Sequence, residues 1–242
     1  MTTPEEFVID RTVRSVTVQL RCNRGDVKVP HAYESDTRSM NVVIATPRRD
    51  LKRDTILAIA QQVFLEEGYT ATSMSTIAAR VGGSKGTLYN YFRSKAELFV
   101  AVIQNQCEIQ QNQLFDVQEQ DIRKFLSELG RRFVHLLLSD EVITLHRIVV
   151  AEATRFPEIG EALYEAGPKR GKQRLVTYLK KAIADGRLKP CDPDRAAEHA
   201  TEMCVGGMYR KRLWNVGPAP TEAEIEASIA SAVDVFMAAY GT

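Results

Sequence analysis

The stretch from Ser73 to Lys95, SMSTIAARVGGSKGTLYNYFRSK, places two short helical patterns directly after one another. Apolar residues recur at the spacing i, i+3, i+4 and i+7, which predicts the buried face of a helix: Met74, Ile77, Ala78 and Val81. Gly82 and Gly83 then end that helix, because glycine is a poor helix former and readily adopts a positive φ. Ser84 is a suitable N-cap for a second helix with Leu88 and Phe92 on its apolar side. Two short helices joined by a tight glycine-containing turn predict a helix-turn-helix.

The second helix of this pair directs polar and small residues away from its apolar side. They are Ser84, Lys85, Gly86, Thr87, Tyr89, Asn90 and Tyr91. A helix with such a face fits the major groove of double-stranded DNA. We expect four of them to reach base edges: Ser84, Lys85, Gly86 and Asn90. Lys85 suits guanine O6 and N7, an inward-pointing Asn90 suits adenine, and Gly86 permits a close backbone approach.

Other groups around this helix are suited to hold phosphates, which supply affinity but carry no sequence information. Lys95 lies in the first turn of the following helix, where its ammonium and the free amides would hold one phosphate. Hydroxyl donors for a second phosphate lie at the start of the first helix: Thr72, Ser73 and Ser75. Plainer interpretations stay open: Ser84 and Ser94 as helix caps, Thr87 and Tyr89 as packing residues, and Lys85 as a solvated charge.

Residues 82–99, GGSKGTLYNYFRSKAELF, resemble the DNA-binding signature of the TetR/AcrR family of one-component bacterial repressors. The resemblance is specific over about Arg49 to Gln106, and the family usually has an apolar residue at the position of Gly83. It implies that Tyr89 and Tyr91 contact phosphates. Residues 153–168, ATRFPEIGEALYEAGP, resemble the C-terminal domain of AefR-like members.

Charge is distributed unevenly along the chain. Residues 47–95 carry eight Lys or Arg against four Asp or Glu, although the net charge of all 242 residues is only +1. A basic segment followed by a mildly acidic remainder fits a phosphate-binding head on a body that does not bind nucleic acid. Because the four cysteines are widely spaced, we expect no disulfide framework and no metal site. We also expect no cofactor. No apolar run reaches the ~18 residues of a membrane span, so we expect no membrane segment. We expect a cytoplasmic protein.

Helical periodicity predicts an all-α fold of about nine helices. The expected helices cover residues 50–67, 74–81, 84–92, 95–115, 122–136, 142–150, 159–183 with an interruption near Gly167–Pro168, 192–214 and 221–240. The expected domains are a three-helix helix-turn-helix domain at 47–95 and a helical effector-binding and dimerisation domain at 96–242. We expect residues 1–46 to be an extension, with residues 1–39 disordered or arising from a misassigned start. An arm that touches DNA or a partner is the alternative, since it would carry Arg11, Arg14, Arg21 and Arg24.

One helix-turn-helix covers only a few base pairs, so useful affinity calls for a homodimer and a near-palindromic operator. The last two helices are the expected interface, because they combine small residues with a long apolar stripe. The interface residues we expect are Cys204, Gly207, Met208, Trp214, Ile225, Ile229, Val233 and Phe236.

The resemblance implies that a small-molecule effector enters a cavity among the middle helices and spreads the two heads. The candidate lining residues are Phe133, His135, Leu137, His146, Val149, Phe156, Tyr164, Tyr178 and Met203. Residues of these types are more often ordinary core residues than pocket residues. Glu152 is expected to pair with Arg147 or Arg155, with recognition of a cationic ligand as the alternative.

These features predict a dimeric, effector-released transcriptional repressor. A DNA-binding activator or architectural protein that senses no ligand is the first alternative, and extended, sequence-indifferent protection of DNA would identify the architectural protein. A helical enzyme is the second alternative, which is disfavoured because the sequence shows no tight nucleophile–base pair, no metal-ligand spacing and no phosphate loop.

Overall fold

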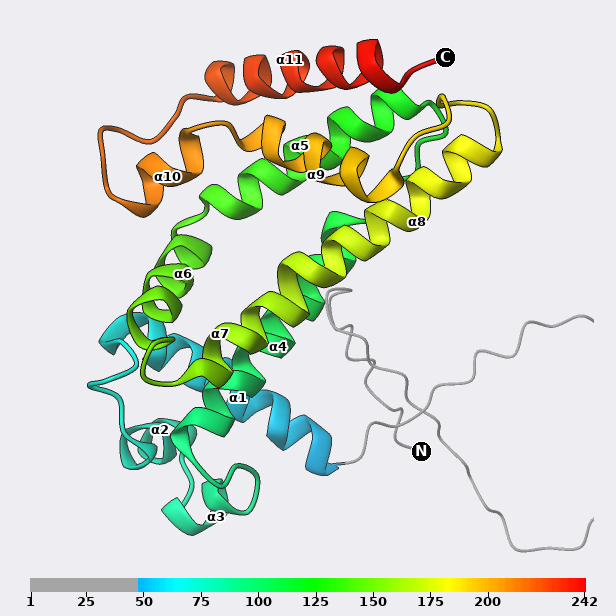
Figure 1. Cartoon of the computed structure of the whole chain (residues 1–242). Helices are drawn as coiled ribbons and strands as arrows, with labels where there is room; N and C mark the ends of the chain where they lie inside the picture. Colours follow the sequence, from blue (N-terminus) through cyan, green and yellow to red (C-terminus); the bar gives the residue numbers. More distant parts are fainter. Residues whose placement is uncertain (1–47) are drawn as a thin grey trace, which may run out of the picture. The chain divides into compact units, whose positions relative to one another are not determined.

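The structure, a computed structural model, describes residues 48–242. The expectations for residues 1–46 lie outside the described residues. Within the described part of the chain, all regular secondary structure is helical, with eleven α-helices, one π-helical turn and a single isolated bridge between Leu188 and Gly241 (Figure 1). The all-α prediction is confirmed.

The helices follow the expected order, with one difference in the second half. The bounds are α1 Arg48–Glu67, α2 Met74–Val81, α3 Lys85–Tyr89, α4 Lys95–Leu114, α5 Ile122–Leu138, α6 Asp140–Glu152, α7 Pro157–Tyr164, η1 Glu165–Lys169, α8 Arg170–Ala184, α9 Pro193–Val205, α10 Met208–Leu213 and α11 Glu222–Tyr240. The expected interruption near Pro168 is the π-helical turn η1, which separates α7 from α8. The helix expected over residues 192–214 is instead two helices, α9 and α10.

Gly206 causes the break between α9 and α10. Its φ of 53° and ψ of −134° lie in a region that residues with a Cβ rarely adopt, so the α-helix cannot continue through it. Other helix ends follow local sequence signals. Asp192 caps α9 with Pro193 in its first turn, and Thr221 opens α11 with a complete capping box to Glu224.

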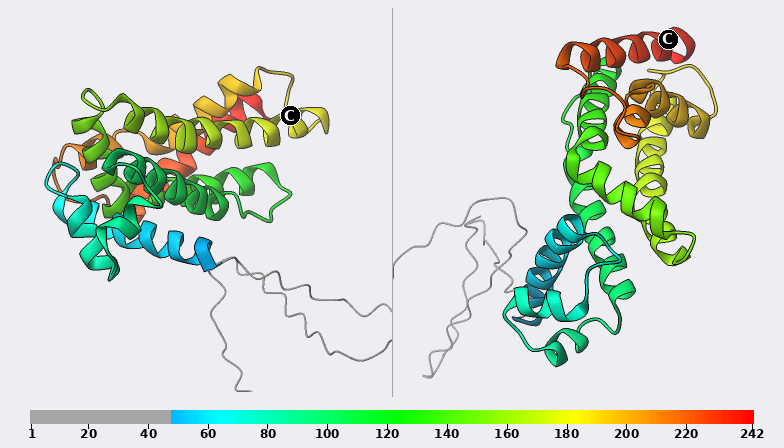
Figure 2. Two further views of the ribbon diagram at one scale, coloured as in Figure 1. Left: turned by 90° about the horizontal axis from the view of Figure 1, so that it is seen from below. Right: turned by 90° about the vertical axis from the view of Figure 1, so that its left-hand side faces the viewer.

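Residues 56–242 form one compact unit (Figures 1 and 2). Its buried apolar side chains gather in two hydrophobic cores. The first core joins α1, α2, α3 and the first half of α4 to residues of α6 and α7, among them Leu145, Val149 and Ile159. The second core joins the end of α4 to α5, α8, α9 and α11. The helix-turn-helix therefore shares its apolar core with α6 and α7, and α4 contributes to both cores.

Both ends of α4 are held by cations. Its last carbonyls accept hydrogen bonds from two arginines, Arg174 of α8 to Gln111 O at 2.8 Å and Arg132 of α5 to Gln113 O at 2.9 Å. Cations at a helix C-terminus satisfy free carbonyls and oppose the negative end of the helix dipole. At the other end, the side chain of Lys95 reaches the loop before α2. None of the helices in residues 48–242 is long and apolar enough to cross a membrane.

Candidate nucleic-acid interface

Helix α2 is bounded at both ends by its own sequence. Ser73 is the N-cap, and its Oγ accepts a hydrogen bond from Thr76 N at 3.1 Å. At the other end Gly82 adopts φ 70°, and the amides of Gly82 and Gly83 bond back to Ala79 O and Ala78 O. This pair of bonds closes the turn as a Schellman motif, which requires a residue such as glycine in the left-handed region. A Cβ on Gly83 would meet only the side chain of Thr87, at 3.9 Å, so the position has room for an alanine side chain.

Helix α3 presents the face that the sequence predicts. Ser84 is its N-cap, accepting from Thr87 N at 3.0 Å, and the Ser84 and Thr87 hydroxyls lie 2.9 Å apart. Buried Leu88 and Phe92 anchor it on the first core. The exposed side consists of Ser84, Lys85, Gly86, Tyr89 and Asn90. The predicted base-reading residues are therefore all exposed on or next to one short, capped helix.

Exposed aromatic and cationic groups lie on that same side. The Tyr89 residue is 42% exposed, and the ammonium of Lys85 lies 5.9 Å from the centre of its ring. Tyr91 is half-buried and packs against the first core. Tyr89 thus has a surface to offer a phosphate, whereas much of Tyr91 is used in packing. Ser75 is exposed on α2, as a phosphate donor must be.

Thr72 and Lys95, which were predicted to contact phosphates, bond instead to carbonyls within the head. Thr72 is 2% exposed, and its hydroxyl donates to Gly68 O at 2.7 Å, so it is buried inside the head. The ammonium of Lys95 donates to the carbonyls of Tyr69, Thr72 and Thr70, at 2.6, 2.9 and 3.3 Å. An ammonium has three donors, so these carbonyls occupy all of them. Lys95 is a clamp within the head in this structure, and burial lowers the pKa of its side chain.

The arginine at the end of α2 is also engaged. Arg80 forms ion pairs with Glu66 at 2.6 Å and Glu67 at 3.4 Å, both in the last turn of α1. Hydrogen bonding to Glu66 raises the pKa of Arg80. Because these three side chains are exposed or half-exposed, the pairs orient α2 on α1 more than they stabilise it.

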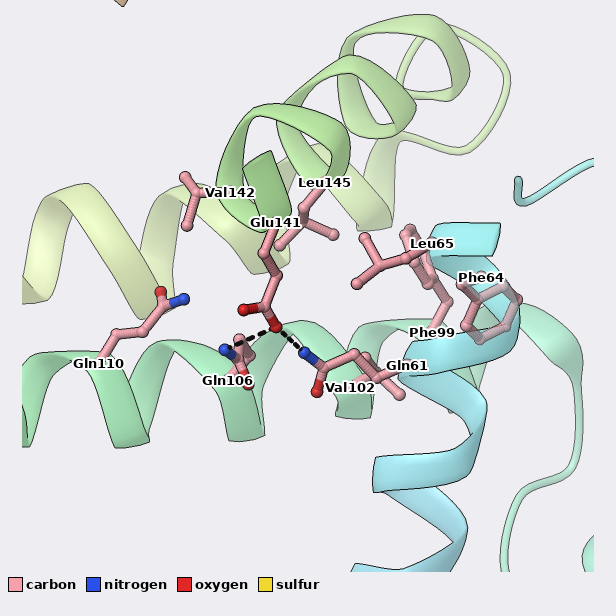
Figure 3. A pocket seen from close by; sticks show the side chains of 10 residues that line it. All are labelled: Gln61, Phe64, Leu65, Phe99, Val102, Gln106, Gln110, Glu141, Val142 and Leu145. Carbon is pink, nitrogen blue, oxygen red and sulfur yellow. Dashed lines mark hydrogen bonds between the residues drawn. The ribbon is translucent and has the colours of Figure 1, made fainter. Parts of the chain in front are cut away.

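A small hollow lies between α1, α4 and α6 (Figure 3). Phe64, Leu65, Phe99 and Val102 form part of its apolar wall, and the carboxylate of Glu141 accepts hydrogen bonds from the amides of Gln61 and Gln106 (Figure 3). It encloses about 10 Å³, roughly the space that one water molecule needs. No effector-sized molecule fits there in this conformation. Sequence reasoning missed Glu141, because an acidic residue in the first turn of a helix is ordinary.

The nine residues predicted to line an effector pocket are not brought together. Val149 and Phe156 pack in or against the first core, and Phe133, Leu137, Tyr178 and Met203 pack against the second. The ring of His146 bonds to the Tyr209 hydroxyl at 2.7 Å, and His135 pairs with Glu222 at 3.0 Å. Tyr164 is 58% exposed. A wider open basin on α5 is lined mostly by charged and polar side chains, unlike the mainly apolar sites that hold small organic molecules.

Comparisons with known proteins identify the family. Residues 56–102 match the family Bacterial regulatory proteins, tetR family, and residues 124–242 match the AefR-like transcriptional repressor, C-terminal domain. A solved structure assigned to the TetR family of transcriptional regulators, from Mesorhizobium loti, superposes with a TM-score of 0.77 at 28% identity, covering 81% of this chain and 100% of that one. This chain belongs to the TetR family.

Two further relatives agree with this assignment. The flavonoid-responsive regulator FrrA has a TM-score of 0.69 at 31% identity over 79% of this chain and 98% of that one. The HTH-type transcriptional regulator YhgD of Bacillus subtilis (strain 168) is 26% identical over 150 residues, which are 60% of this chain and 76% of YhgD. The chain is therefore a DNA-binding transcriptional regulator, as TetR-family proteins are, and such regulators dimerise and bind small-molecule effectors.

Most of the residues predicted for the dimer interface have little exposed surface within one subunit. Five of its eight residues, Cys204, Ile225, Ile229, Val233 and Phe236, are at most 5% exposed and form the second core within one subunit. The apolar stripe of α11 is used against α5 and α9 of the same chain. The predicted residues that retain substantial surface are Gly207 and Trp214, with Met208 half-buried. The outward side of α11 instead shows small residues and Val235, which is 53% exposed.

Proposed function

We propose that this TetR-family chain acts as a homodimeric repressor that binds a near-palindromic operator and is released by a small organic effector. The single observation that carries the DNA-reading part is the exposed polar side of α3. It presents Lys85, Tyr89 and Asn90 on a helix capped by Ser84 and anchored by Leu88. We place this activity in the cytoplasm and assign no catalytic role.

In this proposal Lys85 and Asn90 contact base edges, with Ser84 and Gly86 at the end of the helix that enters the groove. Tyr89, Ser73 and Ser75 contact the flanking phosphates. The buried Thr72 and the clamped Lys95 act inside the head instead, since their polar groups already have partners.

The dimer in this proposal uses the outward side of α11 together with Trp214. Trp214 is 67% exposed and Val235 is 53% exposed, and both lie outside the subunit core. A two-fold dimer makes the operator symmetric, with half-sites about one helical turn of DNA apart or a multiple of it.

For effector release, two similarities support the proposal. Residues 124–242 match the C-terminal domain of AefR-like repressors, and FrrA, a protein of the same fold, is named as flavonoid-responsive. Since the hollow near Glu141 has little room, an effector would have to bind a second, more open conformation. Preferential binding to that conformation is what linkage requires of a releasing ligand.

The experiment is operator selection from random duplexes with the purified protein, followed by affinity measurements and footprinting on the selected sequence. We expect a short protected palindrome. Lys85→Ala should relax the preference at one base step by about 1–3 kcal/mol. Lys180→Ala, an exposed lysine of α8 in the body, is the charge-matched control and should leave that preference unchanged.

Two outcomes would count against this function. Extended protection without sequence preference would indicate an architectural protein instead. A folded dimer that binds no duplex at low salt would remove the DNA-reading assignment of α3 altogether, because phosphate contacts alone should then give measurable affinity.

A further inference from the structure

The loop between α1 and α2, residues Gly68–Ser73, is defined here as the entry loop. It sets where α2 begins, because its last residue, Ser73, is the N-cap of α2. Thr72 closes the loop on itself by donating from its amide and its hydroxyl to Gly68 O. Any shift of this loop moves the start of α2, and α3 follows α2 after a closed Schellman turn. The loop therefore lies at the start of the segment that carries the reading helix.

Helix α4 holds the entry loop from one side through Lys95. The Lys95 ammonium bonds to three carbonyls of the loop and lies 4.3 Å from the centre of the Tyr69 ring. Charge-assisted hydrogen bonds are stronger than neutral ones, and a cation over an aromatic face adds further attraction. Because the Lys95 side chain bonds to backbone carbonyls, it holds the backbone of the entry loop in place.

The body holds the same loop from the other side, through the end of α6 and the residues that follow. The Thr70 hydroxyl donates to Glu152 Oε1 at 2.5 Å, and Glu152 is the last residue of α6. The ring of Tyr69, which is 3% exposed, meets the ring of Phe156 edge-on at 5.3 Å between centroids. Glu152 was expected to pair with Arg147 or Arg155; it accepts from Thr70, and Arg147 donates to the carbonyls of Leu213 and Arg212.

Helix α6 therefore contacts the head at both of its ends. At its start Glu141 accepts from Gln61 of α1 and Gln106 of α4, and at its end Glu152 accepts from Thr70 (Figure 3 shows the first of these contacts). A rigid helix that is attached to the head at two points transmits a tilt, whereas one attachment would leave the head free to pivot.

We propose that Thr70, Glu152 and Lys95 are positioning residues for DNA reading, and that the contact of Glu152 with the entry loop is a connection from body to reading helix that does not pass along α4. This inference rests on the proposed reading role of α3. In this arrangement a displacement of the end of α6 moves the entry loop directly, and with it α2 and α3.

The test compares Thr70→Val, which removes the donor at nearly constant volume, with Glu152→Gln, which keeps an acceptor oxygen, and with Glu152→Ala. Thr70 is exposed, so its substitution should leave the fold intact, which thermal unfolding checks. For the free protein we expect faster amide hydrogen exchange in α2 and α3 of Thr70→Val and Glu152→Ala, with the C-terminal half of α4 unchanged. Glu152→Gln should restore most of the protection.

On the selected operator, Thr70→Val should weaken binding by roughly three- to tenfold, the scale of one ordinary hydrogen bond lost at an exposed site. The salt dependence should stay that of the wild type, since no phosphate contact is lost. Lys95→Met should likewise weaken binding with an unchanged salt slope. A phosphate-binding Lys95 would instead lower the slope by about one.

The outcomes separate this inference from the proposed function. Unchanged exchange in α2 and α3 of Thr70→Val overturns the inference, whether or not an operator is found. Wild-type operator affinity of Thr70→Val, alongside weakened binding by Lys85→Ala, overturns the inference and leaves the reading role of α3 in place. A reduced salt slope in Lys95→Met returns that lysine to the phosphate backbone.

Discussion

Replacing Phe236 by alanine tests whether the stripe of α11 belongs to the subunit core. The Phe236 residue is 1% exposed, and its ring lies 4.8 Å from that of Tyr240 within the second core. Removing a fully buried phenylalanine costs about 3–5 kcal/mol in lost burial and cavity formation. For a chain of this size each kcal/mol lowers the melting temperature by roughly 2–4 °C, so the variant should melt about 6–20 °C below the wild type.

The control is an exposed valine on a helix outside the proposed interface. Val150 of α6 is 69% exposed, so Val150→Ala should change the free energy of unfolding by no more than about 0.5 kcal/mol. Denaturant unfolding of both variants should be measured at one fixed subunit concentration, because the stability of a dimer depends on protomer concentration. Sedimentation under native conditions reports association separately.

We expect Phe236→Ala to lower the free energy of unfolding before it affects dimerisation. This expectation is refuted if the variant unfolds like the wild type at high protein concentration and yet dissociates at concentrations where the wild type stays dimeric. That pattern would mean that Phe236 contacts the second copy, as the sequence alone had indicated, and that α11 packs differently in the dimer.

Two further predictions concern single side chains. In Gly171→Ala the new Cβ would lie 2.9 Å from Gln111 Nε2 and would displace the amide that donates to Gly167 O. We expect the free energy of unfolding, measured in urea, to fall by about 1–3 kcal/mol. In the control Gly207→Ala the new Cβ meets nothing within 4 Å, so the free energy of unfolding should change by no more than about 0.5 kcal/mol. Burial lowers the pKa of His146, so the unfolded chain binds its proton more readily, and the free energy of unfolding should fall as pH drops below about 6.5. His146→Gln should show a shallower fall in pH-dependent denaturation, and an unchanged slope would contradict this assignment.

Local signals explain which parts of the site could be predicted from sequence. Ser73, Gly82 and Ser84 act on backbone groups within a few residues of themselves, so their roles as caps and turn residue follow from spacing alone. The exposed side of α3 follows equally well from the positions of Leu88 and Phe92.

The clamp made by Lys95 could not be predicted in this way. Its partners are backbone carbonyls 23 to 26 residues earlier in the chain, and a carbonyl carries no side-chain signal. The same holds for Arg132 and Arg174, which cap the carbonyl end of α4 from two other helices.

The stripe of α11 illustrates a different limit. Periodicity identified Ile225, Ile229 and Phe236 as one apolar face, and that face is buried. A helical pattern shows that a face needs a partner, but it does not distinguish another helix of the same chain from a second copy. In this structure the face packs on α5 and α9 of the same chain.

The shared first core bears on how this regulator could be recombined with others. Leu145, Val149 and Ile159 lie far along the chain, yet they pack in one core with Ile77 and Leu88 of the helix-turn-helix. A hybrid protein that exchanged residues 47–95 alone would set a foreign apolar surface against these three side chains. A graft that carries α4, α6 and α7 along with the reading helices would keep the contacts of the first core together, and operator choice would then travel with all of those helices.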